Sequence, residues 1–161
     1  MMSSQLDQNI LLGVSGGVAA YKSADLCRRL LERGARVRVV MTRGAQAFVT
    51  PLTFQALSGN PVHTELLDER AEAGMGHIEL ARWADIILVA PASANTIARL
   101  SVGLADDLLS TVCLASDAPL LTAPAMNQQK WAAQATAANV ARLRARGVAV
   151  IGPGFVDQAC G

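Results

Sequence analysis

The sequence predicts an α/β fold: a Rossmann-like open parallel sheet with helices on both faces, giving three layers. Short apolar runs alternate with helical patterns along the chain, and strands separated by helices pair in parallel through right-handed crossovers. Of the 161 residues, 52% are hydrophobic and only 17% are charged, as expected where strands are buried on both faces. This length suits one domain of ordinary size.

Two strand–helix units open the chain. Residues 9–14 form an apolar run typical of a buried strand, and the helical pattern at 18–33 ends before Gly34, a residue that favours a helix C-terminus. Residues 35–41 predict the second strand and residues 46–58 the second helix.

The same alternation continues to the end of the chain. A short extended piece is expected at 62–66, a loop at 68–76, a helix at 77–83 and a fully buried strand at 85–90. Later elements are helices at 94–100 and 107–115, a strand at 120–123, a long helix at 129–146 and a strand at 148–151. Periodicity is lost only in the tail at 152–161, where Gly152, Pro153 and Gly154 predict a mobile loop.

Charge and cysteine usage narrow the possible partners. The net charge is +1, and the densest basic cluster, at 142–146, ends a helical pattern, where it complements the helix dipole. This low net charge and the position of the cluster favour a solvated helix end over a nucleic-acid site.

No apolar run reaches the roughly 18 residues that span a membrane. Cys27, Cys113 and Cys160 have no metal-ligand spacing and fit a reducing cytoplasm, and the first two fall in patterns typical of the core.

The turn after the first strand resembles a dinucleotide-binding fingerprint. It reads Gly-Val-Ser-Gly-Gly-Val-Ala at 13–19, with Ser15 at the second glycine position. Backbone N–H groups beyond Gly16 and Gly17 would receive a phosphate, and the Ser15 hydroxyl could donate one more hydrogen bond. The alternative is an ordinary strand-to-helix turn.

Polar side chains also follow two other strands. The strand ending at Thr42 and Arg43 lacks the acidic residue that holds a nicotinamide ribose, which argues against an NAD dehydrogenase. Arg43 leaves NADP open, but Thr42 suits a mononucleotide phosphate or ribitol better. Ser93, Asn95 and Thr96 follow the most buried strand, where they either bind a polar ligand or cap a helix, and capping needs only one of them.

The histidines and one acidic pair have simpler interpretations. Asp106 and Asp107 open a helix, where carboxylates stabilise the positive dipole end. His77 also begins a helix, where a neutral imidazole could accept a proton, although capping of a surface helix explains it as well. Nothing in the sequence around His63 marks it as functional.

A further polar interruption follows the strand at 120–123. Residues 124–127 read Pro-Ala-Met-Asn and lead into an alanine-rich helical pattern, so that Asn127 lies at the carboxyl edge of the sheet. In open α/β sheets that edge is where ligands bind. Packing explains an asparagine there poorly.

These motifs together carry a family resemblance that covers residues 10–161. The chain resembles the homo-oligomeric flavin-containing cysteine decarboxylases through Ser-Gly-Gly at 15–17, Ser-Ala-Asn-Thr at 93–96, His77 and Pro-Ala-Met-Asn at 124–127. The sequence at 75–80, Met-Gly-His-Ile-Glu-Leu, and the ending Gln-Ala-Cys-Gly at 158–161 are most similar to members that decarboxylate phosphopantothenoylcysteine.

The resemblance implies a reaction and a cofactor. The reaction would be FMN-dependent decarboxylation of 4'-phospho-N-pantothenoylcysteine to 4'-phosphopantetheine in coenzyme A biosynthesis. A carboxylate cannot leave a cysteine without an electron sink. In the family scheme the thiol is oxidised to a thioaldehyde, carbon dioxide is lost, and the remaining ene-thiol is reduced again. The cofactor carries the redox step while the protein orients and protonates the substrate.

The resemblance also assigns residues. His77 would be the base that assists thiol oxidation, Asn127 would hold the departing carboxylate, and Cys160 would be the proton donor to the ene-thiol. The residues implied at FMN are Ser15, Gly16, Gly17, Val18, Thr42, Phe48, Ser93, Ala94, Asn95, Thr96 and Ala125. Those implied at the substrate, besides Asn127, are Met126, Asp157, Gln158 and Ala159. A cytoplasmic homo-oligomer, a trimer or a multiple of it, is expected, with FMN near subunit contacts.

The chain departs from the family pattern in two places. Lys130 stands where the family has a methionine, beside the expected flavin site. The family also continues past Ala-Cys-Gly. We therefore expect residues 1–152 to form the FMN-binding domain and 153–161 to be the start of a mobile substrate-covering flap that is cut short, without a ligase domain.

Three other functions are compatible with parts of the pattern. A peptidyl-cysteine decarboxylase would share His77 and Asn127, but the Gln-Ala-Cys-Gly ending argues against it. A flavin prenyltransferase should lack the Asn127 motif. A non-enzymatic flavin-binding regulatory protein would not need His77, Asn127 and Cys160 together.

Overall fold

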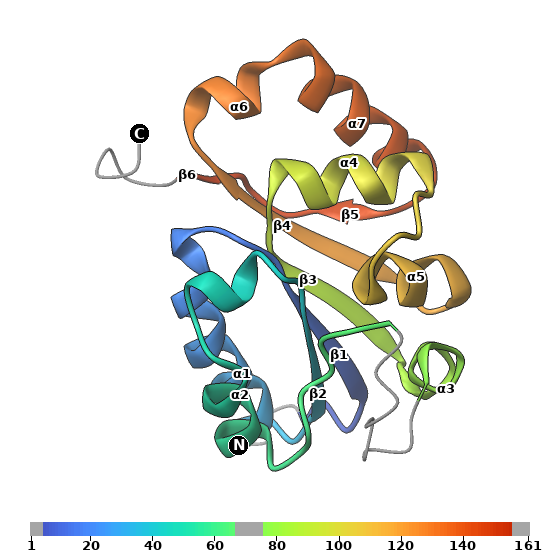
Figure 1. The fold of residues 1–161 in the computed structure, drawn as a ribbon. Coiled ribbons are helices and arrows are strands. Elements are labelled where there is room, and N and C mark those ends of the chain that lie inside the picture. The colour runs from blue at the N-terminus through green and yellow to red at the C-terminus, as the bar shows by residue number, and fades with distance from the viewer. Residues whose placement is uncertain (1–4, 67–75, 156–161) are drawn as a thin grey trace.

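The computed structural model describes residues 5–66 and 76–155, which form a three-layer α/β/α arrangement around one parallel sheet (Figure 1). The strand order is β2-β1-β3-β4-β5, and β6 also pairs with β4. The strands are β1 (Asn9–Val14), β2 (Arg36–Met41), β3 (Ile86–Ala92), β4 (Leu120–Met126), β5 (Ala149–Val150) and β6 (Gly154–Phe155). The predicted fold class is confirmed.

Helices connect these strands in the order that the hydrophobic pattern predicts. They are η1 (Val18–Tyr21), α1 (Lys22–Glu32), η2 (Ala45–Ala47), α2 (Pro51–Ser58), α3 (His77–Trp83), α4 (Ala94–Val102), α5 (Leu108–Ala115), α6 (Gln128–Ala132) and α7 (Gln134–Ala145). In Figure 1, α1 and α2 lie on one side of the sheet, and α3, α4, α5 and α7 on the other.

Each face of the sheet has its own hydrophobic core. Along β1, Leu12 packs with Cys27 and Phe54 beneath α1 and α2, whereas its neighbour Leu11 packs with Leu80 and other residues of the opposite helices. The alternation follows from the two-residue period of a strand, which sends successive side chains to opposite faces. Burial on both faces explains the near-continuous apolar runs in the sequence.

Two predicted helices are interrupted in the structure. The helix expected at 46–58 is divided, because Thr50 is extended and Pro51 begins α2, where a proline without an N–H loses no hydrogen bond. The helix expected at 129–146 is divided at Ala133, which is also extended and starts α7. The redirected α7 buries Val140 and Leu143 against the sheet.

The end of the described chain adds a pairing that the sequence does not predict. After β5 the β-structure is interrupted at Gly152 and Pro153. The next strand, β6, pairs with the last two residues of β4, with Ala125 opposite Gly154 and Met126 opposite Phe155. Parallel β-structure therefore extends past residue 152, where the flap is expected to begin. Residues 156–161 lie outside the described residues.

The α5 helix begins with a reciprocal capping box. The Asp107 carboxylate accepts from the Ser110 N–H at 2.8 Å, and the Asp107 N–H donates to the Ser110 hydroxyl at 3.3 Å. Asp107→Ala should therefore lower the free energy of unfolding by about 1 kcal/mol. Urea unfolding of the protein measures this. Asp117→Ala, an exposed position, should change it by less than about 0.5 kcal/mol, and an equal loss in both variants would contradict the assignment.

Candidate functional site

A cavity of about 890 Å³ opens at the carboxyl edge of the sheet. It lies where the chain, having placed β2 on one side of β1, places β3 on the other. At such a reversal the turns after the two central strands separate and leave a crevice. The lining residues are Gly16, Met41, Thr42, Arg43, Gly44, Gln46, Thr64, Glu65, Leu66, Ser93, Asn95, Thr96, Arg99, Asp106, Asp107, Leu108 and Leu109.

The two glycines after β1 are required for different reasons. Gly17 has φ 146° and ψ 161°, a backbone region that is open essentially to glycine alone. A Cβ on Gly16 would come within 3.0 Å of the carbonyl carbon of Gly44 in the turn after β2. Gly16 thus allows the turns after β1 and β2 to meet at the cavity wall. An ordinary strand-to-helix turn, the alternative interpretation of this motif, does not explain such a close approach.

Ser15 lies beside the cavity but does not line it. Its side chain is fully buried, and its hydroxyl donates to the Pro91 carbonyl oxygen at 2.6 Å and accepts from the Ser93 N–H at 2.8 Å. The hydroxyl proton is thereby committed to β3. Donation from Ser15 to a phosphate, as the sequence suggests, is not available in this geometry.

The turn after β3 both caps a helix and lines the cavity. The Ser93 hydroxyl accepts from the Thr96 N–H at 3.1 Å, which makes Ser93 the N-cap of α4. The first N–H groups of a helix have no acceptor within the helix. In α4 those of Ala94 and Asn95 form no hydrogen bond to protein within the described ranges, so they suit an anionic or carbonyl oxygen.

Charges around the cavity are unevenly placed. Arg99 of α4 donates to the Asp106 carboxylate at 2.7 Å, so this cation is neutralised at the cavity wall. Arg43, at the end of β2, forms no ion pair with any residue that the structure describes. An anionic group would therefore be attracted to the β1–β2 side of the cavity, where Gly16 and Thr42 also lie.

Several lining residues are absent from the sequence prediction. Arg99 and Asp106 are the clearest cases, together with Leu108 and Leu109 of α5. Arg99 follows Thr96 by three residues on one helix and shares its face, so helical spacing could have suggested it. Nothing local in the sequence indicates that α5 forms a wall of this cavity.

Of the predicted cofactor residues, Gly16, Thr42, Ser93, Asn95 and Thr96 are brought together at the cavity. The others, Ser15, Gly17, Val18, Phe48, Ala94 and Ala125, are not among its lining residues. His77 is the half-buried first residue of α3, outside the cavity lining. Asp157, Gln158, Ala159 and Cys160 lie outside the described residues.

Asn127 lies at the same edge of the sheet, after β4. Pro124 pairs with Ala92, so the last two residues of β4 and Asn127 after them lie beside the turn that begins α4. The Asn127 carboxamide oxygen accepts from the Lys130 N–H at 2.8 Å and caps α6. This bond orients the side chain, whose amide nitrogen carries the donors that a carboxylate would need. Met126 is buried and the Lys130 side chain is exposed.

The two described cysteines are unsuited to nucleophilic chemistry. Burial raises the pKa of the Cys113 thiol to about 12, with Asp107 adding to the effect. Burial also raises the pKa of the Cys27 thiol. Both therefore remain protonated thiols at neutral pH and act as core side chains, as their sequence patterns predict.

Family membership follows from comparison with known proteins. A family model described as Flavoprotein matches residues 2–161. The chain belongs to the flavoprotein family. The coenzyme A biosynthesis bifunctional protein CoaBC of Vibrio vulnificus is 58% identical over 160 residues, covering 99% of this chain and 40% of the relative. This flavoprotein domain therefore spans about two fifths of that protein's length.

Solved flavoprotein structures share the fold closely. The FMN-dependent cysteine decarboxylase SpaF superposes with a TM-score of 0.84 at 30% identity, covering 95% of this chain and 92% of its own. A PPC decarboxylase mutant complexed with pantothenoylaminoethenethiol has a TM-score of 0.77 at 35% identity, covering 91% of this chain and 82% of its own.

Across residues 5–66 and 76–155, no helix of this flavoprotein is long and apolar enough to cross a membrane.

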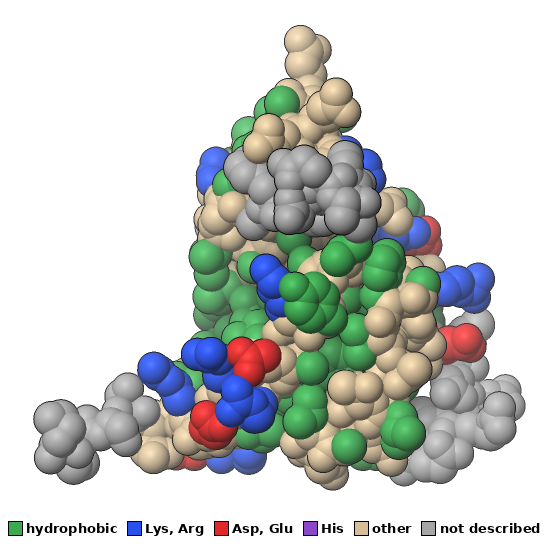
Figure 2. Space-filling view, turned by 90° about the vertical axis from the view of Figure 1, so that its left-hand side faces the viewer, with side chains coloured by type: hydrophobic (Ala, Val, Ile, Leu, Met, Phe, Trp, Pro, Cys, Tyr) green, Lys and Arg blue, Asp and Glu red, His purple; other side chains and the backbone are tan. Residues whose placement is uncertain are grey.

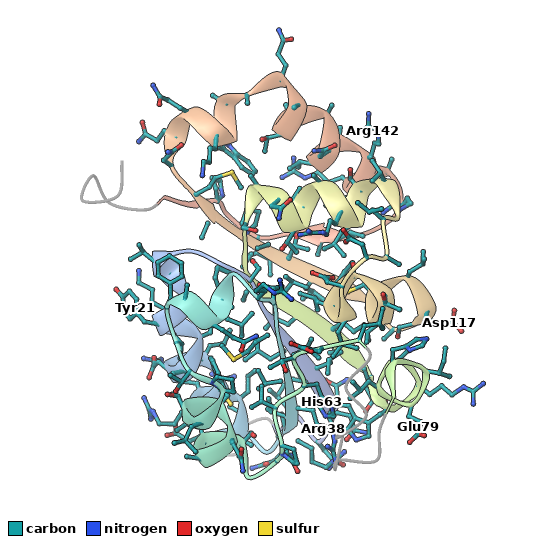
Figure 3. The ribbon with its side chains drawn as sticks, in the orientation of Figure 1. Tyr21, Arg38, His63, Glu79, Asp117 and Arg142 are labelled. Atoms are coloured by element: carbon teal, nitrogen blue, oxygen red, sulfur yellow. The ribbon has the colours of Figure 1, made fainter. Side chains whose placement is uncertain are left out.

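His63 is buried next to the segment that forms one wall of the cavity. Its N–H and carbonyl pair with β2, and Thr64, Glu65 and Leu66 follow it into the lining. Its Nε2 atom and the Nη1 atom of Arg38 are buried, and neither has a hydrogen-bond partner among the residues that the structure describes. Figure 3 shows the two labelled side chains close together. Burial, followed by the Arg38 charge, lowers the pKa of His63.

This lowered pKa predicts a loss of stability in acid. The fold favours neutral His63, so protons bind preferentially to the unfolded chain once the pH falls below its ordinary pKa of about 6.5. The free energy of unfolding should decrease from that pH downward until the folded-state pKa is passed. Denaturant unfolding between pH 7 and 5 measures the loss. His63→Gln should show a smaller decrease over this interval, and a decrease as large as in the parent protein would contradict the prediction.

Proposed function

We propose that this flavoprotein catalyses the FMN-dependent decarboxylation of 4'-phospho-N-pantothenoylcysteine to 4'-phosphopantetheine, a step of coenzyme A biosynthesis. The observation that carries the proposal is the 58% identity to CoaBC over 99% of the chain. The likeness to PPC decarboxylase in complex with a pantothenoyl compound supports the same substrate class. A cytoplasmic location would accompany this role.

The residues at the cavity fit a flavin mononucleotide. Its phosphate would suit the β1–β2 side, where Gly16, Thr42 and Arg43 supply a close backbone approach, a hydroxyl and a cation. Polar edges of the flavin would suit the N–H groups at the start of α4, and Leu108 and Leu109 offer apolar contact. The chemistry that flavin supplies is a reversible two-electron oxidation of the substrate thiol to a thioaldehyde.

The remaining steps would be carried by side chains of this chain. In the proposal His77 accepts the proton released when the thiol is oxidised. Asn127 donates hydrogen bonds to the substrate carboxylate, so that the scissile bond is held beside the C=S group that takes up its electron pair. After carbon dioxide leaves, Cys160 donates a proton to the ene-thiol during its reduction.

We further propose that a second copy of the chain completes the site, in a trimer or a multiple of it. His77 is absent from the cavity lining of a single chain, which supports a site shared between subunits. Tyr21, Phe48 and Leu52 are 59%, 50% and 69% exposed. Figure 2 shows hydrophobic side chains gathered on the face nearest Tyr21, which points outward in Figure 3. Such a face suits burial against a subunit.

A peptide ending in cysteine is the second candidate substrate. The likeness to SpaF, an FMN-dependent cysteine decarboxylase, favours a thiol-bearing C-terminal carboxylate as the reacting group without fixing the rest of the molecule. Both candidates share the oxidation and decarboxylation steps. They differ in the phosphate and pantothenoyl groups, which only the first substrate has.

Carbon dioxide release tests the choice directly. The purified protein should carry FMN, and should release carbon dioxide from phosphopantothenoylcysteine at least a hundredfold faster, judged by kcat/KM, than from a peptide ending in cysteine. The order of magnitude is that expected when binding energy from a remote substrate group supports catalysis. Cys160→Ser should release carbon dioxide but form no 4'-phosphopantetheine. Faster turnover of the peptide would support the second candidate, and a protein that cannot be loaded with flavin would exclude both.

Asn127→Asp separates the proposed catalytic role from the structural one. Aspartate keeps the oxygen that caps α6 at the Lys130 N–H, so stability should change by less than about 1 kcal/mol. Its negative charge replaces the amide donors that would meet the substrate carboxylate. The rate of carbon dioxide release should fall by about a hundredfold or more. Near-normal turnover would show that Asn127 acts only as a helix cap.

A further inference from the structure

The Ser15 hydroxyl joins two turns that are remote in sequence but adjacent at the cavity. It follows β1 directly, and its partners, the Pro91 carbonyl oxygen and the Ser93 N–H, belong to the end of β3 and the start of α4. The Ser15 N–H also donates to Pro91 O, at 3.2 Å. One residue thus makes three hydrogen bonds across the gap between the two strand ends.

Ser15 is connected to both walls of the cavity, to one through its neighbour in the chain and to the other through its hydrogen-bond partner Ser93. On one side, the next residue is Gly16, whose backbone meets Gly44. On the other side, Ser93 caps α4 through the Thr96 N–H, so the position of Ser93 sets where the first N–H groups of that helix lie. Any shift of Ser93 relative to Ser15 would change the separation of the two walls.

Ser23 provides a contrasting hydroxyl in the same region. It is 2% exposed and donates to the carbonyl oxygen of Ala90, the residue just before Pro91. Within the part of the chain that the structure describes, its hydroxyl makes this one hydrogen bond, which joins α1 to β3 and does not involve the turn that begins α4. Ser15 and Ser23 are therefore both buried and both bonded to β3, but only Ser15 bonds to the turn at the cavity.

We propose that Ser15 is a positioning residue for the flavin site. Its hydroxyl fixes the Gly16 turn against the N-terminus of α4, so that both walls are preset at the separation the cofactor needs. It does so without touching the cofactor, since its proton and one lone pair are already bound within the protein. This proposal rests on the proposed flavin-dependent function and assigns Ser15 a different role from direct binding of phosphate.

The test compares Ser15→Ala, Ser15→Thr and Ser23→Ala in the full chain. Flavin is removed, the FMN dissociation constant is measured by quenching of flavin fluorescence, and thermal unfolding of the flavin-free proteins is measured in parallel. Both alanine variants should be less stable, because each removes a buried hydroxyl hydrogen bond to β3. Ser15→Ala also leaves the Ser93 N–H without the hydroxyl that accepts its hydrogen bond. Only Ser15→Ala should also weaken FMN binding, by about tenfold or more. Ser15→Thr, which keeps the hydroxyl, should restore it.

The outcomes separate positioning from general stability. Equal dissociation constants for Ser15→Ala and Ser23→Ala would show that Ser15 stabilises the fold alone and would overturn the inference. If Ser15→Ala does not fold, Ser15→Cys, which fills the space with a weaker donor and acceptor, enters the same comparison. If the unsubstituted protein binds no flavin, the proposed function fails, whereas flavin binding that Ser15→Ala leaves unchanged contradicts this inference only.

Discussion

Burial of the sheet on both faces is the constraint on which the site depends. Strands covered by helices on either side can present polar groups to a ligand only at their ends, because the interior positions belong to two separate cores. The order β2-β1-β3-β4-β5 then decides which ends are separated, since the chain reverses direction across the sheet between β1 and β3. The cavity, the glycine turn and the start of α4 all meet at that point.

Much of this arrangement could be predicted from the sequence, because its causes are local. Gly17 and Gly34 mark turns with positive φ, and apolar runs mark strands that are buried on both faces. The features that the sequence did not predict depend on residues far away in the chain. Ser15 takes its role from Pro91, which is 76 residues away, and β6 exists only because β4 offers it an edge. The helix interruption at Ala133 could not be predicted, because no proline or glycine marks that position in the sequence.

The hydroxyl groups at the carboxyl edge of the sheet differ in whether they line the cavity or only hold the backbone around it. Ser15 and Ser93 are engaged with backbone groups, and Thr42 accepts from the Ala45 N–H at 3.2 Å while it lines the cavity. The sequence could identify all three as polar residues at strand ends. It could not say which would face a ligand, because that depends on the neighbouring strand. A polar residue in a fingerprint can therefore serve the ligand by fixing the backbone that binds it.

The pairing of β6 with β4 bears on the proposed role of Cys160 as a proton donor. Phe155 is paired with Met126, the residue before Asn127, so the chain is anchored at the proposed carboxylate site. Cys160 follows five residues later in the sequence, within a reach of roughly 18 Å for an extended chain. In the proposed mechanism, proton delivery by Cys160 would therefore be an intramolecular step, with the β4–β6 pairing as its nearest described anchor.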